Sequence, residues 1–252
     1  GSDTLIGGDG DDTYVVDSSD TITENSSEGT DEVQASFSFT LVDNVENLTL
    51  TGSSDIDAIG NSEANTLTGN AGHNTLNGGE GSDTLIGKVG GDLLVGGNGN
   101  DKLKGGKGKD TAVFSSKSNV IKLFIKKEQN TKDGKDTLIS IENVLAGSGD
   151  DIIYGNKKSN ILSGGEGNDL LDGGKGFDKL IGGEGKDIFK LSKGKGYDLI
   201  QDFKDKEDKI FIGSMKNVNF KNKGEDFFIY KGKDLLAKVK GAKGDLSKKG
   251  KY

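Results

Sequence analysis

Aspartate or asparagine recurs every nine residues over much of this sequence, at a fixed distance from a group of glycines. The segments GGEGSDTLI at 78–86 and GGNGNDKLK at 96–104 have this pattern, and GKVGGDLLV fills 87–95 between them. If two nine-residue copies form one coil, copies eighteen residues apart stack with their acidic side chains about 4.8 Å apart. Like charges this close repel by about 1 kcal/mol per pair even in water. A hard cation with six to eight oxygen ligands would relieve the repulsion, and calcium suits such a site better than magnesium, zinc or copper.

Eleven copies keep this frame, six over 60–113 and five over 146–190. Glycine holds the first place except at Ala146, and the fourth place except at Glu63 and Lys158. The eighth place is Leu, Ile or Phe except at Ala112. The sixth place is always Asp or Asn, and its residues are Asn65, Asn74, Asp83, Asp92, Asp101, Asp110, Asp151, Asn160, Asp169, Asp178 and Asp187.

Each place in the frame has a structural role. Glycine at the first, second and fourth places lets the backbone take positive φ and turn tightly. The seventh to ninth places alternate as a three-residue strand would, so the large eighth-place side chain points into a narrow core. The frame therefore predicts a coil of two turns and two strands, with loop carbonyls beside the acidic rows. The loop glycines expected at the cation sites are Gly79, Gly81, Gly97, Gly99, Gly106, Gly108, Gly165, Gly167, Gly174 and Gly176.

Stacked sixth-place residues define the candidate cation sites. The four pairs with two carboxylates, which we expect to bind, are Asp83–Asp101, Asp92–Asp110, Asp151–Asp169 and Asp169–Asp187. The three pairs with one amide, which we expect to bind weakly or stay empty, are Asn65–Asp83, Asn74–Asp92 and Asn160–Asp178. Up to about seven ions would result, at the weak affinity typical of extracellular calcium modules. Lys88 at a second place and Lys158 at a fourth place predict distorted loops, and Asp12 is a further candidate ligand, with Asp3 a weaker one.

The repeats resemble the GGxGxDxUx nonapeptide of the RTX (repeats in toxin) family, a calcium-binding β-helix repeat. DDTYVVD, NVENLTLTG and SIENVLAG are similar to the connecting segments of large secreted RTX proteins, and GYDLIQDF with DKIFIG is similar to their closing segment. The resemblance implies an all-β, right-handed parallel β-roll that binds calcium. It also implies a bacterial protein exported unfolded by the type I secretion machinery through an uncleaved C-terminal signal.

The expected organisation has five segments. Partial repeats and a β connecting segment fill 1–59, the first roll block fills 60–113, and a second β connecting segment fills 114–145. The second roll block fills 146–190, and a C-terminal cap with the secretion region fills 191–252. Residues 226–241 predict a hairpin around Lys231–Asp234 that would cover the exposed end of the solenoid. Its core would come from Phe203, Phe211, Phe220, Phe227 and Phe228, the alternative being an aromatic platform for carbohydrate.

Composition limits the other classes of function. Of 252 residues, 31% are hydrophobic and 42 are glycine, which is too little apolar surface for a large globular core. No residue is cysteine, so disulfides and thiolate metal sites are excluded. The first lysine is Lys88, and the later lysines are dispersed among acidic residues, which argues against nucleic acid as a partner. No apolar run is long enough to form a transmembrane segment. The first residues, GSDTLI, match the later part of a repeat, so we expect the chain to be part of a longer protein.

Catalytic motifs are absent from the sequence. GxSxG and HEXXH do not occur, and we expect the single histidine, His73, to be an exposed loop residue. We therefore expect no enzyme activity. Two hypotheses remain for the function of the calcium-folded chain. It is a secreted structural or adhesive solenoid with a cell-surface or carbohydrate partner, or it is the secretion and folding domain of an exported hydrolase or pore-forming toxin, and the upstream sequence would decide between them.

Overall fold

The computed structural model describes residues 1–115 and 117–240, and all regular elements in these residues are β-strands. This part of the chain therefore contains no helix that could cross a membrane. Residues 241–252, the end of the expected secretion region, lie outside the described residues. The chain forms two compact units: unit 1 comprises Gly1–Phe114, Lys126–Glu128 and Asp133–Ile141, and unit 2 comprises Ser115–Ile125, Gln129–Lys132 and the chain from Glu142 onward. The expected division into five segments stays a prediction.

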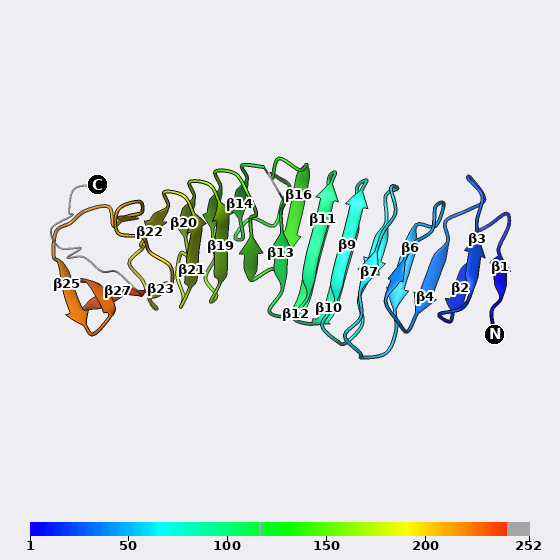
Figure 1. The fold of residues 1–252 in the computed structure, drawn as a ribbon, viewed down its shortest axis with the longest axis horizontal. Coiled ribbons are helices and arrows are strands. Elements are labelled where there is room, and N and C mark those ends of the chain that lie inside the picture. Colours follow the sequence, from blue (N-terminus) through cyan, green and yellow to red (C-terminus); the bar gives the residue numbers. More distant parts are fainter. Residues whose placement is uncertain (116, 241–252) are drawn as a thin grey trace. The chain divides into compact units, whose positions relative to one another are not determined.

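Unit 1 is a parallel β-solenoid in which successive strands belong alternately to two sheets (Figure 1). Its strands are β1 (Thr4–Ile6), β2 (Thr13–Val16), β3 (Thr21–Thr23), β4 (Glu32–Ala35), β5 (Phe39–Thr40), β6 (Asn47–Leu50), β7 (Ala58–Ile59), β8 (Thr66–Thr68), β9 (Thr75–Glu80), β10 (Thr84–Gly90), β11 (Leu93–Asn98), β12 (Lys102–Gly108), β13 (Thr111–Val113) and β16 (Lys135–Ile139). One sheet has the order β16-β12-β10-β8-β6-β4-β2, and the other has the order β13-β11-β9-β7-β5. The first strand, β1, pairs with β3. This alternation is what a coil of two strands requires.

The core of unit 1 consists of stacked eighth-place side chains. Leu67, Leu85 and Leu103 lie one above another because β8, β10 and β12 pair with a register of eighteen residues. On the facing sheet, Leu76 and Leu94 stack in the same way. All five are at most 1% exposed. Burying a leucine contributes about 1.5–3 kcal/mol relative to leaving it exposed, so each added coil extends the core by two such contributions.

Segments outside the nonapeptide frame continue the solenoid of unit 1. β4 pairs with β6 through Glu32↔Asn47, a separation of fifteen residues, and β2 pairs with β4 through Thr13↔Glu32, a separation of nineteen. Lys102 of β12 pairs with Thr137 of β16, thirty-five residues later. The solenoid therefore tolerates coils of different lengths, provided that the strand keeps its inward-facing residue.

Unit 2 repeats the arrangement. Its strands are β14 (Val120–Lys122), β15 (Gln129–Asn130), β17 (Asn143–Leu145), β18 (Ile152–Tyr154), β19 (Ile161–Glu166), β20 (Leu170–Asp172), β21 (Lys179–Glu184), β22 (Ile188–Lys190), β23 (Asp198–Ile200), β24 (Lys209–Phe211), β25 (Val218–Lys223), β26 (Asp226–Lys231) and β27 (Asp234–Lys240). One sheet has the order β14-β18-β20-β22-β24, and the other has the order β25-β26-β27-β23-β21-β19-β17. The eighth-place residues Ile153, Leu171 and Phe189 are fully buried, as are Leu162 and Leu180 on the facing sheet.

The predicted C-terminal hairpin is present. β26 and β27 pair antiparallel, with Lys231 opposite Asp234, and β27 pairs parallel with β23. The hairpin thus covers the sheet edge that β23 would otherwise leave unpaired, as a terminal cap must.

The aromatic core expected for this cap forms only in part. Phe203 and Phe227 are buried, and Phe220 and Phe228 are half-buried. Phe211 is 41% exposed, so its placement in the core was wrong. Phe211 ends β24 and pairs with Lys190, the ninth-place residue of the copy at 182–190. Alternation along the strand turns this position outward.

Candidate metal centre

All eleven sixth-place residues are buried, at most 2% exposed, although each carries a carboxylate or an amide. Each lies directly before a strand whose eighth-place residue is in the core, so the fold fixes its position. An unpaired ionised group in such a place is costly, and buried charges are normally paired or bound to metal.

The structure brings the predicted partners together through one repeated hydrogen bond. In all seven predicted pairs, the backbone N–H of the earlier sixth-place residue donates to Oδ1 of the sixth-place residue one coil later. The distances to Oδ1 for the carboxylate pairs are 2.9 Å for Asp83–Asp101, 3.0 Å for Asp92–Asp110, 2.8 Å for Asp151–Asp169 and 3.0 Å for Asp169–Asp187. For the mixed pairs they are 2.7 Å for Asn65–Asp83, 2.9 Å for Asn74–Asp92 and 2.8 Å for Asn160–Asp178. Register alone therefore builds the acidic rows.

The second carboxylate oxygen of the aspartates has a different environment. Oδ2 is buried without a hydrogen-bond partner in six of them, namely Asp83, Asp92, Asp101, Asp169, Asp178 and Asp187. In each of these copies Oδ2 occupies the space that a Cβ on the first-place glycine would need. In these six copies a larger first-place residue would displace the carboxylate, because Oδ2 lies against the glycine Cα. A buried carboxylate oxygen without a protein donor is suited to bind a cation.

Burial changes the acidity of these groups. It raises the pKa of Asp101 and Asp169 to about 7, with neighbouring carboxylates adding to the effect, while one backbone N–H bond opposes it. The pKa of Asp83, Asp178 and Asp187 rises to about 6, again mainly through burial. These carboxyls therefore ionise fully only above neutral pH or beside a cation.

Backbone carbonyls are the other oxygen atoms near these carboxylates that could bind a cation. Among the described residues, three or more His, Cys, Asp or Glu side chains nowhere gather around a point where a metal ion could bind. A Cβ on Gly99 would collide with the carbonyl oxygen of Gly81 one coil earlier, and one on Gly108 would collide with that of Gly90. The loop carbonyls are therefore stacked beside the carboxylate rows. A donor set made only of carboxylate and carbonyl oxygens fits calcium.

The loops with lysine differ from the expectation. Lys88 adopts φ of 70°, in the left-handed region, and pairs in register with Gly106, so this loop keeps the glycine geometry at the cost of strain in a non-glycine residue. Lys158 does not adopt positive φ, and its Nζ lies 2.5 Å from Oε1 of Glu142. The predicted distortion of the Lys88 loop was thus wrong, because this loop keeps its register. The backbone of the Lys158 loop does differ from that of the glycine loops.

Several row residues lie outside the nonapeptide frame. The backbone N–H of Asp12, a half-buried residue, donates to Asp31 at 2.8 Å, and that of Asp31 donates to Glu46 at 2.7 Å. Asp101 donates in the same way to Asp136 at 2.8 Å. Asp3 is exposed, and its N–H donates to Oδ1 of the half-buried Asp20 at 3.1 Å. The row through Asp83 and Asp101 is consequently longer than the repeats that predicted it.

Unit 2 also has additional row residues. Asp187 donates its N–H to Asp208 at 3.0 Å, and the register of β21 with β23 places Asp198 beside Asp178. Burial and the neighbouring Asp178 carboxylate raise the pKa of Asp198 to about 8. The segment KGKGYDLIQ at 193–201 has the frame of a twelfth copy, shifted by the two residues 191–192. A search of the sequence that allowed short insertions would have found it.

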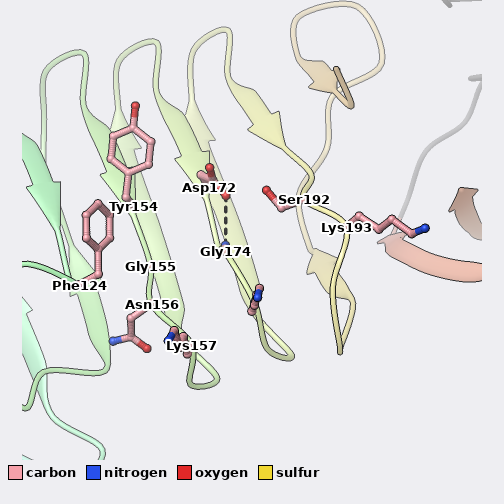
Figure 2. A pocket seen from close by; sticks show the side chains of 10 residues that line it. Phe124, Tyr154, Gly155, Asn156, Lys157, Asp172, Gly174, Ser192 and Lys193 are labelled. Atoms are coloured by element: carbon pink, nitrogen blue, oxygen red, sulfur yellow. Dashed lines mark hydrogen bonds between the residues drawn. The ribbon is translucent and has the colours of Figure 1, made fainter. Parts of the chain in front are cut away.

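Unit 2 carries a pocket of about 430 Å³ that is lined in part by loop residues of the repeats (Figure 2). Figure 2 shows Phe124 and Tyr154 together at one side, with ring centroids 6.4 Å apart. Asp172 accepts hydrogen bonds from the Gly174 N–H at 3.1 Å and from Lys190 Nζ at 2.6 Å. The other lining residues are Gly155, Asn156, Lys157, Lys175, Ser192 and Lys193. His73 is on the surface, as expected, where its Nδ1 accepts the Gly91 N–H at 2.8 Å.

Comparison with known proteins gives a family match. A scan against protein families matched the RTX calcium-binding nonapeptide repeat (4 copies) over residues 1–22, 59–94, 86–114, 145–180 and 163–197, just over half of the chain. No curated protein matched. Among solved structures, the extracellular lipase LipA from Serratia marcescens is similar at 17% identity and a TM-score of 0.26, covering 87% of this chain. The match covers 43% of the lipase chain, so this chain spans less than half of its length.

Proposed function

This chain belongs to the RTX calcium-binding nonapeptide repeat family, and from that premise we propose that it is a module of a secreted bacterial protein whose folding is coupled to calcium. The observation that carries the proposal is the set of buried carboxylate oxygens without partners, each beside a glycine loop. Bound calcium would neutralise these carboxylates, and its preference for six to eight oxygen ligands would be met by carboxylate and carbonyl oxygens.

The chain's own residues determine why folding requires a ligand. The sixth-place carboxylates stack at the coil spacing, so they repel one another when ionised. Because they are buried, water does not solvate their charge. The narrow core contributes only two large side chains per coil, which is little against the entropy of ordering eighteen residues. Folding in neutral solution therefore depends on neutralising the rows, and ligand binding free energy becomes folding free energy.

The proposed location follows from affinity. Extracellular calcium modules bind at about 10⁻⁴–10⁻³ M. Calcium in the cytosol is far below this range, so the chain would stay unfolded there and competent for export by the type I secretion machinery. Outside the cell it would fold into a rigid solenoid, with the secretion signal in 191–252.

The role of the folded solenoid is structural or adhesive rather than enzymatic in this proposal. One observation supports an adhesive surface: the pocket of unit 2 combines the aromatic rings of Phe124 and Tyr154 with exposed Lys157, Lys175 and Lys193. Aromatic rings with a few polar groups are the usual lining of small-molecule sites, and the lysines favour an acidic carbohydrate. The alternative, an accessory domain of an exported hydrolase or toxin, is favoured if a catalytic or membrane-active region precedes Gly1 in the parent protein.

Counting bound ions tests the calcium role. In equilibrium dialysis of the whole chain, we expect at least four calcium ions per chain with dissociation constants near 10⁻⁴–10⁻³ M, and no comparable magnesium binding. Fewer than one calcium ion per chain at millimolar calcium would refute the proposal. Loss of binding to acidic oligosaccharides by F124A with unchanged calcium content would support the adhesive surface, whereas absence of such binding by the wild type would exclude it.

A further inference from the structure

The loops between strands fall into two classes that differ in backbone conformation. Among the eleven copies over 60–113 and 146–190, the eight with Asp at the sixth place all have positive φ at the second- and fourth-place residues. In the three copies with Asn at the sixth place, neither residue does. The second place of these three copies is also asparagine, namely Asn61, Asn70 and Asn156. The two asparagines thus occur together, and the loop conformation changes with them.

In the asparagine loops, the sixth-place amide is hydrogen-bonded on both sides. Its Oδ1 accepts the backbone N–H of the second-place asparagine, at 2.8 Å in each of the three copies. Its Nδ2 donates to a backbone carbonyl of the preceding coil, at 2.7 Å both for Asn74 to Ile56 and for Asn160 to Glu142. Both polar atoms of the amide therefore have hydrogen-bond partners within the chain, whereas Oδ2 of the aspartates has none in the six copies described above.

The second-place asparagine completes the closure. Its Oδ1 accepts the backbone N–H of the fourth-place residue, at 2.9 Å from Glu63, 2.7 Å from Gly72 and 2.8 Å from Lys158. This is the local side-chain to backbone bond that makes asparagine a turn residue. Because the turn is held in this way, the fourth place does not need positive φ. This explains why two asparagine copies accept glutamate or lysine at the fourth place, whereas every aspartate copy has glycine there.

We propose that the second-place residue determines which loops bind calcium. Glycine, or Lys88 with the same backbone, leaves an open carboxylate and stacked carbonyls for the ion, whereas asparagine closes the loop with amide hydrogen bonds and takes none. The three asparagine loops are then the parts of the rolls that form without calcium. The inference rests on the calcium-binding function proposed above and adds to it which positions are filled.

The test converts one loop class into the other. The copy at 155–163 becomes a glycine loop in the triple variant N156G/K158G/N160D, whose new carboxylate lies in register with Asp178. The single variant N160D is the matched control, because it adds the same carboxylate without changing the second place. Bound calcium per chain is counted by equilibrium dialysis at about 10 mM calcium, well above the expected affinity range.

We expect the triple variant to bind one more calcium ion than the wild type and N160D to bind no additional ion. The reverse variant G174N/D178N should bind at least one ion fewer while keeping its β circular dichroism. An additional ion in N160D alone, or none in a folded triple variant, would overturn the inference. Absence of calcium from the wild type would instead refute the proposed function, so the two failures are distinguishable. If the triple variant does not fold, an unchanged ion count in G174N/D178N overturns the inference by itself.

Discussion

Asp169→Asn should change stability in opposite directions with and without calcium. Asp169 lies in the middle of a row: its Oδ1 accepts the Asp151 N–H at 2.8 Å, and its own N–H donates to Asp187 at 3.0 Å. It is 1% exposed, and its Oδ2 has no partner. Asparagine keeps both backbone hydrogen bonds and replaces only Oδ2, so the substitution removes the charge without removing the register.

The calcium-free effect follows from the pKa. Burial raises the pKa of Asp169 from 3.8 to about 7. The pKa is higher in the folded state, so protonation of Asp169 stabilises the fold. This contribution to the free energy of unfolding is complete below about pH 4 and is lost as the pH rises through about 7. At pH 8 the ionised group thus costs the calcium-free fold about 4 kcal/mol. The amide removes this cost but buries an NH₂ donor, which costs about 1–3 kcal/mol, so the variant should be more stable by about 1–3 kcal/mol.

In calcium the order should reverse. The substitution removes a ligand from the two pairs Asp151–Asp169 and Asp169–Asp187. At calcium 100-fold above its dissociation constant, each site contributes about 2.7 kcal/mol, so two sites contribute about 5 kcal/mol. The variant loses this contribution of about 5 kcal/mol but keeps the gain of about 1–3 kcal/mol in the calcium-free fold. In calcium it should therefore be less stable than the wild type by about 3 kcal/mol.

Both effects can be measured at about pH 8 by far-UV circular dichroism. In chelator, the folding of each protein is driven by trimethylamine N-oxide, which favours burial, and D169N should fold at the lower concentration. In about 10 mM calcium, near 100-fold above the tighter end of the expected range, D169N should unfold at the lower urea concentration. The control D43N removes an exposed carboxylate of unit 1 and should change neither midpoint. Lower stability of D169N in chelator, or equal stability in calcium, would refute the reasoning.

Three further substitutions or conditions probe the coil. Gly99→Ala should lower the free energy of unfolding by more than about 3 kcal/mol, because φ is 143° and the new Cβ meets a carbonyl of the adjacent coil, whereas Gly213→Ala, in open space at φ of 71°, should cost about 1 kcal/mol. Leu94→Ala should cost about 2–5 kcal/mol by leaving a cavity in the core, while Val89→Ala, 46% exposed, should stay within about 0.5 kcal/mol in urea unfolding. In chelator, lowering the pH from about 8 to about 5 should increase the β circular dichroism, because the raised pKa of Asp101, about 7, lets its carboxyl protonate in the folded state; an unchanged spectrum would contradict this.

The repeated part of the fold was predictable because its period is local. A glycine at each turn and a large residue at each eighth place determine both the loops and the two columns of the core, and Leu85 over Leu103 follows directly from eighteen-residue stacking. The same period predicted which sixth-place residues are paired. No other part of the chain has a signal as regular.

The ends of the acidic rows could not be predicted in this way. Asp31 and Asp136 join a row through coils of nineteen and thirty-five residues, and only strand pairing shows which residue is stacked on which. Lys88 and Lys158 appear as equal defects in the frame. Their different backbones depend on whether the second place can form an amide turn, which is a property of the whole loop.

Calcium-dependent folding of the whole chain is the central claim, and far-UV circular dichroism during a calcium titration tests it most directly. The titration runs from chelator to about 10 mM calcium, across the affinity range of extracellular modules, with magnesium as the control ion. We predict little β signal in chelator at about pH 8, where the rows are ionised, and a cooperative rise with calcium but not with magnesium. A full β signal in chelator that calcium leaves unchanged would contradict the account.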